Sequence, residues 1–292
     1  MQKVLNPDYR ENDGFRPLLY QKPSELCKQP GQELPLFWRE KMEFSREWRS
    51  LIRNYIQAYN FSLATSRDED TPAIQRFLEG RYSVEMAREI CPFDLHRFRQ
   101  YGHGLILKDH TGEVRGTIFE LGYDTPEKTS YTIRLAIDEA VEGNNLGYHL
   151  MMYSALLAME KGSRVKRGIV QFENLRSLYI NLNKVGWICD GFDPNITGMG
   201  PFFHISLPLD PSGLMGNAID KERVHTFIQN HQAEKDYLML DVEDLEGVSS
   251  MYSDTDFKIV ALLPPGMMGE RGSFFAIPAS SLQLDERYKP YL

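Results

Sequence analysis

The chain has 292 residues, of which 42% are hydrophobic and 25% are charged, and its formal net charge is −8. A chain of this length and composition is globular, with a sizeable core and one or two domains. The acidic balance and the lack of any block of lysine and arginine exclude a protein that follows the phosphate backbone of nucleic acid.

The number and spacing of the cysteine and histidine residues indicate which compartment and which metal or disulfide sites are possible. The three cysteines are Cys27, Cys91 and Cys189. Their odd number and wide spacing argue against a disulfide framework or a zinc knuckle, and the histidines are scattered. The N-terminus has no apolar core of a signal peptide, and no run approaches roughly 18 apolar residues. We expect a cytoplasmic protein with no membrane span, nucleic-acid partner or metal.

The N-terminal part predicts a leader followed by one helix. Residues 1–36 are rich in Pro, Asn, Asp and Gln. From Phe37 to Ile56 the apolar residues recur at helical spacing, which predicts an amphipathic helix. We take residues 1–59 as an N-terminal extension that packs onto the body of the protein.

Strands and helices alternate from about residue 60 to residue 209, which predicts a mixed α/β domain. A helix opens at Thr71-Pro72, in good N-cap and first-turn positions. A second helix is expected near 83–90, and another at 174–187. One more is expected after the loop at 141–147, with an apolar face formed by Leu150, Met151, Ser154, Leu157 and Ala158. The expected strands are 61–66, 102–109, 114–123, 129–137 and 165–172, and a closing hairpin is expected over 187–192 and 202–209.

The last part of the chain, residues 210–292, predicts a small α/β extension. A polar segment leads to a helix at 223–231 and to strands at 236–242 and 257–263. These strands extend the main sheet or form a small lobe of their own. The sequence shows no internal repeat.

A loop rich in glycine and asparagine connects the strand at 129–137 to the next helix. It reads VEGNNLGYHL over residues 141–150. The first N–H groups of a helix lack intrahelical partners and carry partial positive charge, which suits phosphate. Gly143 and Gly147 allow a ligand to approach the backbone, and Asn144 and Asn145 tolerate left-handed conformations. The alternative is a capping turn that binds nothing.

The sequence resembles the GNAT acyltransferase superfamily over residues 60–209. LAIDEAVEGNNLGYHLM, residues 135–151, lies over the family's loop motif [Q/R]-x-x-G-x-[G/A], with Glu142 and Asn145 as departures. The resemblance implies a mixed central sheet flanked by helices, and a loop that holds the pyrophosphate of acetyl-CoA. The implied cofactor-binding residues are Leu135 and Ile137, through main-chain groups, and Gly143, Asn144, Asn145, Leu146, Gly147 and Tyr148.

A second stretch, NLRSLYINLNKVGW at 174–187, resembles the family's helix N-x-x-[A/S]…[L/Y]-x-K-x-G-[F/W]. Asn174, Ser177, Lys184 and Gly186 match in type and order. The spacing from Asn174 to Gly186 is one residue longer than the commonest form. Asn174 can cap the helix or reach the pantetheine arm of the cofactor, and Ser177 belongs to the same implied site.

Acyl transfer to an amine needs a base for the amine and an acid for the leaving thiolate. The resemblance implies a tyrosine as the acid, four residues before the glycine, where this chain has Leu182. Tyr179 is the nearest replacement, although a packing role is open to it. Glu120 and Glu173 end strands and are the candidate bases, with a solvated carboxylate as the alternative for each.

The resemblance therefore predicts an N-acyltransferase. The enzyme would move an acetyl or other acyl group from acyl-CoA to an amine acceptor, a small molecule or a peptide, by direct attack. One alternative is a long-chain acyltransferase that uses acyl-CoA or acyl carrier protein. Another is a non-catalytic GNAT-fold binding module. A homodimer is compatible with each of them.

Overall fold

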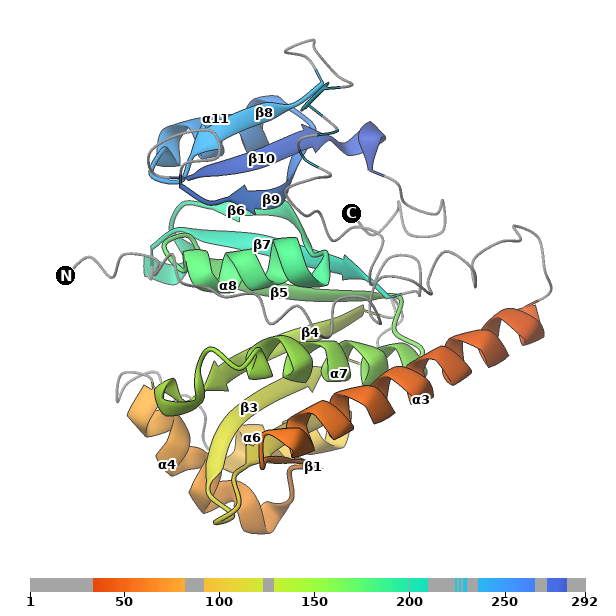
Figure 1. Ribbon diagram of the computed structural model, residues 1–292. Helices are drawn as coiled ribbons and strands as arrows, with labels where there is room; N and C mark the ends of the chain where they lie inside the picture. Colours follow the sequence, from red (N-terminus) through yellow and green to blue (C-terminus); the bar gives the residue numbers. More distant parts are fainter. Residues whose placement is uncertain are drawn as a thin grey trace.

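The structure is a computed structural model that describes residues 34–81, 92–122, 129–198, 200–209, 236–265 and 272–282, with 224, 226, 228 and 229. One sheet of ten strands runs through these residues in the order β1-β2-β3-β4-β5-β7-β6-β9-β10-β8 (Figure 1). The strands are β1 Ser62–Thr65, β2 Gly102–Lys108, β3 Val114–Leu121, β4 Thr129–Ile137, β5 Val165–Gln171, β6 Ile188–Asp193, β7 Phe202–Pro208, β8 Leu238–Asp241, β9 Phe257–Leu263 and β10 Ser273–Pro278.

Helices cover both faces of this sheet. They are α3 Leu34–Ala58, α4 Thr71–Arg81, α6 Pro92–Tyr101, α7 Leu146–Glu160, α8 Leu175–Tyr179 and α11 Leu245–Asp254. A π-helical turn, η3 Ile180–Val185, continues α8, and the 3-10 turns are η1 Asp68–Asp70, η2 Glu139–Val141, η4 Ile196–Gly198 and η5 Ala279–Ser281. The predicted fold, a mixed sheet flanked by helices, is confirmed.

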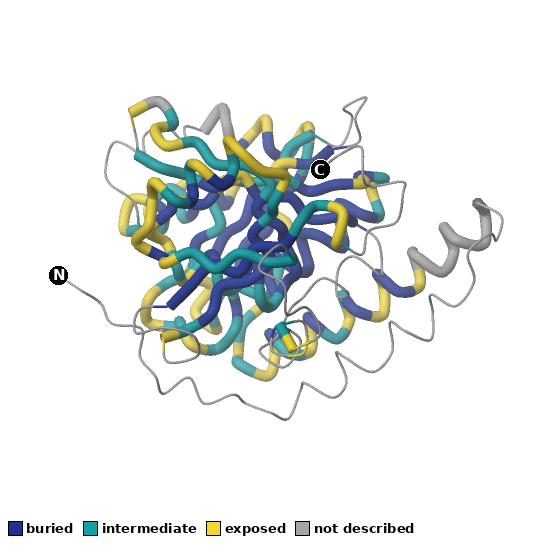
Figure 2. The backbone as a smooth tube through the Cα atoms, turned by 90° about the horizontal axis from the view of Figure 1, so that it is seen from above, coloured by how far each residue is buried: buried dark blue, intermediate teal, exposed yellow. Residues whose placement is uncertain are grey.

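Two apolar clusters divide the helices between the faces. Successive strand residues point to opposite faces, and Ile118 of β3 packs into the cluster with α3, α7 and α8, whereas Phe119 packs into the cluster with α4 and α6. The expected amphipathic helix is α3, which lies along α7 (Figure 1) and donates a hydrogen bond from Ser45 Oγ to Leu156 O at 3.3 Å. Buried residues line the centre of the molecule between these layers (Figure 2).

Three short elements were not predicted: α6, α11 and β10. Each is too short to show a clear period, and α11 includes glycine and serine residues that favour turns. The helix expected near 83–90 lies outside the described residues, as does most of the helix expected at 223–231.

The C-terminal extension continues the main sheet and does not form a separate lobe. Strand β9 pairs antiparallel with β6 through Cys189 and Ile259. Strands β10 and β8 follow outward from β9. The domain boundary at residue 209 stays a prediction, with strands of one sheet on both sides of it.

The structure contains a repeat that the sequence did not reveal. Outward from the β6–β9 junction, the order is β6, β7, β5 on one side and β9, β10, β8 on the other. Each half has a strand, a capped helix and two more strands. The caps match as well, because Asn174 accepts from Ser177 N at 3.1 Å and Asp244 accepts from Gly247 N at 2.8 Å. The sequence shows no repeat, so the two halves share a strand order and not a residue pattern.

The two repeated halves also contact each other reciprocally. Tyr252 of α11 donates a hydrogen bond to Cys189 O of β6 at 2.8 Å. Leu262 N of β9 donates to Asn183 Oδ1 of η3 at 2.9 Å. These exchanged contacts give the two halves a local pseudo-twofold relation, and they hold the C-terminal extension against the middle of the sheet.

Candidate functional site

A wedge opens in the sheet between β4 and β5. The two strands are parallel, and they pair only through Thr129–Val165, Ser130–Lys166 and Tyr131–Arg167. The rest of each strand, 132–137 and 168–171, has no ladder partner in the other strand. The two strands therefore run parallel at their start and diverge after Tyr131 and Arg167. The wedge widens toward their carboxyl ends, where α/β sheets generally bind ligands.

A bulge in β4 lies on one wall of this wedge. Thr117 of β3 pairs with Ala136 and Phe119 pairs with Ile133, so Arg134 and Leu135 lie opposite a single residue. Arg134 has φ 57°, a left-handed conformation that is uncommon for a residue other than glycine. Bulges of this kind redirect backbone groups and are frequent beside functional sites. Leu135 and Ile137 thus lie on the part of β4 that leaves β5.

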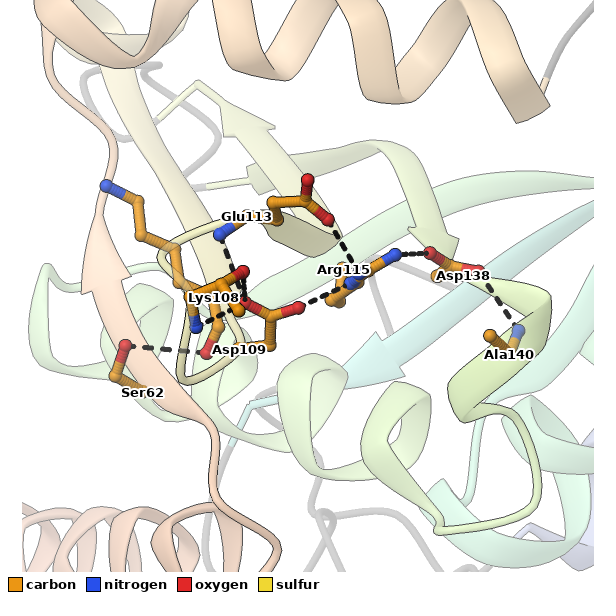
Figure 3. Close-up of polar contacts among 8 residues, drawn as sticks. Ser62, Lys108, Asp109, Glu113, Arg115, Asp138 and Ala140 are labelled. Atoms are coloured by element: carbon orange, nitrogen blue, oxygen red, sulfur yellow. Dashed lines mark hydrogen bonds and ion pairs between the residues drawn. The ribbon is translucent and has the colours of Figure 1, made fainter.

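A network of ion pairs fixes the point where β4 ends and the loop begins (Figure 3). Asp138 accepts from Ala140 N at 3.0 Å and from Arg115 Nη1 at 2.8 Å. Arg115 Nε also binds Asp109 Oδ2 at 2.7 Å. The bond from Ala140 and the Arg115 charge lower the pKa of Asp138, so this carboxylate stays charged.

The loop turns back through two left-handed residues, Gly143 at φ 95° and Asn145 at φ 52°. Helix α7 begins directly afterwards at Leu146. A Cβ atom on Gly147 would lie 3.4 Å from Ile137 Cγ1, an ordinary contact distance. A small side chain therefore fits at this position. The first N–H groups of α7, from Leu146 to Tyr148, start at the wide end of the wedge.

Side chains from three helices hold the loop in place. Tyr55 of α3 donates to Asn144 O at 3.2 Å, and its ring stacks on His149 with 3.9 Å between centroids. His149 Nδ1 donates to Asn145 O at 2.8 Å, and Lys184 Nζ donates to Asn145 Oδ1 at 2.9 Å. Burial lowers the pKa of His149 to about 4, so the ring is neutral near pH 7. Such supporting contacts preorganise a binding loop.

Glu142 departs from the family motif, and the structure shows where its charge goes. Arg81 Nη2 of α4 donates to Glu142 Oε1 at 3.1 Å. Arg176 Nη1 of α8 donates to Glu142 Oε2. Glu142 thus bridges two guanidinium groups.

The extra residue in the second motif is absorbed by the π-helical turn η3. The backbone oxygen of Asn181 accepts from Gly186 N and Trp187 N, each at 3.0 Å. A π-turn accommodates an inserted residue and often lies at a functional site. Asn174 caps α8, with its Oδ1 accepting from Ser177 N at 3.1 Å, so the capping role expected for it is present.

The π-turn contains Asn181, a candidate site residue that was not predicted from the sequence. Asn181 is buried, and its Nδ2 donates to Ser177 Oγ at 3.2 Å. Its buried Oδ1 has no hydrogen-bond partner among the described residues. Counted four residues back from Gly186, the tyrosine position of the family motif falls on Leu182. Because the span from Asn174 to Gly186 is one residue longer than the commonest form, the same position counted forward from Asn174 falls one residue earlier, on Asn181.

The structure places the expected acid and one of the bases as follows. Tyr179 is partly buried and packs against the main core cluster, and Leu182 is fully buried in that cluster. Glu173 is exposed in the turn that follows β5. It therefore lies at the wide end of the wedge, beside Asn174. The roles of Tyr179 and Glu173 stay predictions.

Glu120 lies in a different environment from the one expected of a solvated carboxylate. It is fully buried, forms an ion pair with Lys166, and accepts from Ser154 Oγ of α7 at 2.5 Å. Burial alone would raise the pKa of Glu120, but the Lys166 charge lowers it, so the carboxylate stays charged. The solvated alternative is wrong for Glu120. Its role as a base stays a prediction.

Comparisons with known proteins add the following. No family model and no curated protein matches this sequence. A GNAT-family acetyltransferase from Staphylococcus aureus Mu50 is 12% identical over 51% of this chain and 99% of that chain, with a TM-score of 0.40. Ard1 from Thermoplasma volcanium is 17% identical over 52% of this chain and 99% of that chain, with a TM-score of 0.43.

A third similar structure is yncA from Salmonella typhimurium, solved with its cofactor acetyl-CoA. It is 16% identical over 52% of this chain and 95% of that chain, with a TM-score of 0.43. Within the described residues, no helix is long and apolar enough to cross a membrane, and no group of acidic, histidine or cysteine residues gathers as metal ligands do.

Proposed function

We propose that the protein is a GNAT-type N-acyltransferase that moves an acetyl or other acyl group from acyl-CoA to an amine acceptor. The observation that carries the proposal is the wedge between β4 and β5, with the glycine loop and the start of α7 at its wide end. Beyond Tyr131 and Arg167 the two strands share no ladder bonds with each other, so a pantetheine arm can lie between them and bond to their main-chain groups. The helix N-terminus suits its pyrophosphate.

The residues present fit such a cofactor. The loop from Gly143 to Tyr148 would hold the pyrophosphate through backbone N–H groups, and main-chain groups of Leu135 and Ile137 would face the pantetheine and thioester. Asn181 supports this fit, because its buried Oδ1 lacks a partner among the described residues. Ser177 N donates to Asn174 Oδ1 at 3.1 Å. Both residues follow β5, so they would meet the pantetheine arm on the side of the wedge opposite β4.

The reaction is a direct transfer. The amine nitrogen attacks the thioester carbonyl carbon, the C–S bond breaks, and an amide and free CoA result. An alkyl amine has a pKa near about 10, so it must lose a proton before attack. Glu173 is exposed at the wide end of the wedge and is the more accessible of the two candidate bases. The thiolate has a pKa of about 8.5, and Tyr179 or water can protonate it.

Binding of CoA tests the proposal most directly. We expect millimolar CoA or acetyl-CoA to raise the melting temperature, because a ligand that binds only the folded state stabilises it by mass action. Pantetheine without phosphates should give a smaller shift at the same concentration. If CoA leaves the melting temperature unchanged, the acyltransferase proposal fails and the non-catalytic module becomes the better reading.

The acid is tested by Tyr179→Phe, which removes only the hydroxyl group. If Tyr179 is the general acid, turnover of the variant should fall on the order of 10²–10⁴-fold. If Tyr179 only packs against the core, turnover should change little. Asn181→Ala is the companion variant, and it should lower turnover if the amide holds the cofactor beside the sulfur. Steady-state rates with a panel of amines measure both variants. Wild-type turnover in both variants would show that neither Tyr179 nor Asn181 takes part in the reaction.

A further inference from the structure

An ion pair joins the two sides of the wedge at its wide end. Glu142 lies in the loop after β4, and Arg176 lies in the first turn of α8, after β5. Between them the strands have no ladder bonds beyond Tyr131–Arg167. The Glu142–Arg176 pair therefore reconnects β4 and β5 through side chains at the end where the backbones have parted.

The same carboxylate holds a second guanidinium group. Arg81 binds Glu142 at 3.1 Å and Glu139 at 3.0 Å. All three members of the Arg81–Glu142–Arg176 chain keep contact with water, with 24%, 28% and 46% of their side-chain surfaces exposed. Partly exposed ion pairs contribute little to folding stability, so replacing one of their partners costs little free energy. The guanidinium groups of Arg81 and Arg176 thus lie beside the expected phosphate site, each paired with Glu142.

We propose that Glu142 is a displaceable counter-ion and that the Glu142–Arg176 pair is a latch across the wedge, exchanged for phosphate when acyl-CoA binds. This inference rests on the proposed function. In the closed latch, the carboxylate occupies Arg81 and Arg176. When the pyrophosphate reaches the start of α7, its charge repels Glu142 and attracts both guanidinium groups. Arg–phosphate contacts are strong and can be bidentate, which favours the exchange.

The latch explains how an acidic residue can stand beside an anion site. In the ligand-free protein Glu142 is neutralised by the arginines, so the loop keeps its shape without a bound anion. The carboxylate competes with the ligand for those arginines and lowers the affinity for CoA. Arg176 and Arg81 then supply the positive charge that the motif position itself lacks.

The decisive experiment compares Glu142→Gln with wild type in CoA binding, measured by calorimetric titration. Removing the competing charge should tighten CoA binding about tenfold, and Arg176→Gln should weaken it about tenfold, as expected for charge changes at partly solvated contacts. The matched control is Glu69→Gln, which removes one carboxylate charge from an exposed ion pair with Arg67 and leaves the pairs of Arg81 and Arg176 intact. It should change the dissociation constant by less than about twofold.

A probe without phosphates separates electrostatics from loop damage. Pantetheine has the arm of the cofactor but no phosphate, so Glu142→Gln should not tighten its binding, whereas the same variant should tighten the binding of CoA about tenfold. Equal or weaker CoA binding by Glu142→Gln, with wild type still binding, would overturn the latch and leave the proposed function in place. If neither protein binds CoA, the proposed function and the latch fall together.

Discussion

Gly147→Asp is expected to abolish CoA binding while leaving the protein folded. Gly147 is the second residue of α7, and a Cβ atom there would make only an ordinary contact with Ile137, so the position accepts a side chain. A carboxylate at a helix N-terminus is favourable for the helix dipole. Against a bound pyrophosphate it is repulsive, and juxtaposed like charges cost several kcal/mol. We expect affinity to fall by on the order of 100-fold or more.

Gly147→Ala is the control for this charge effect. It adds the Cβ atom without the carboxylate, so it should lose less than about tenfold in affinity. Both variants should keep the wild-type melting temperature, or exceed it, in the absence of CoA, because alanine also favours a helix over glycine. Wild-type affinity in Gly147→Asp would place the phosphates away from this loop and remove the main support for the site.

Glu120→Gln is expected to destabilise the protein by about 3–5 kcal/mol, the usual cost of leaving one partner of a buried ion pair without the other. Lys166 would keep a buried charge with Ser154 Oγ, at 2.7 Å, as its remaining hydrogen-bond partner in the cluster. Urea unfolding near pH 7 measures the loss. Because the pKa of Glu120 is lowered in the folded state, the pair contributes above the usual carboxyl pKa of 4.5 and its contribution is lost as pH falls below that value.

The double variant Glu120→Gln with Lys166→Met distinguishes an ion pair from a catalytic base. Removing both charges should recover most of the stability that either single change loses. A general base would behave differently, with turnover falling 10²–10⁴-fold and the rising limb of the pH–rate profile lost, while stability changed little. Per folded molecule, Glu120→Gln should keep its turnover if the structural role is the main one.

Local pattern predicted the elements of this fold well where they are long or strongly patterned. The apolar spacing from Phe37 to Ile56 predicted most of α3, and the strand predicted before the glycine loop has the same bounds as β4, Thr129–Ile137. Periodicity and capping are properties of neighbouring residues, so they can be read without knowing the contacts. The short elements α6, α11 and β10 lacked such patterns.

The repeat of the β5–β7 half escaped detection for a related reason. Its two copies share a backbone path and a capped helix, but the cap is Asn174 in one and Asp244 in the other. Many side chains satisfy the same cap and the same buried strand positions. Backbone geometry can therefore recur where residue identity does not.

The sequence by itself determined the glycine loop, the presence of a helix after it, the motif spacing and the mixed α/β class, because these depend on residues close together in the chain. Only the tertiary structure decided the partners of the charged residues. Glu142 meets Arg81 and Arg176 from 61 and 34 residues away, and Glu120 meets Lys166 from 46 residues away. A carboxylate is solvated, paired or reactive according to its surroundings, and those surroundings are assembled only when distant segments pack together.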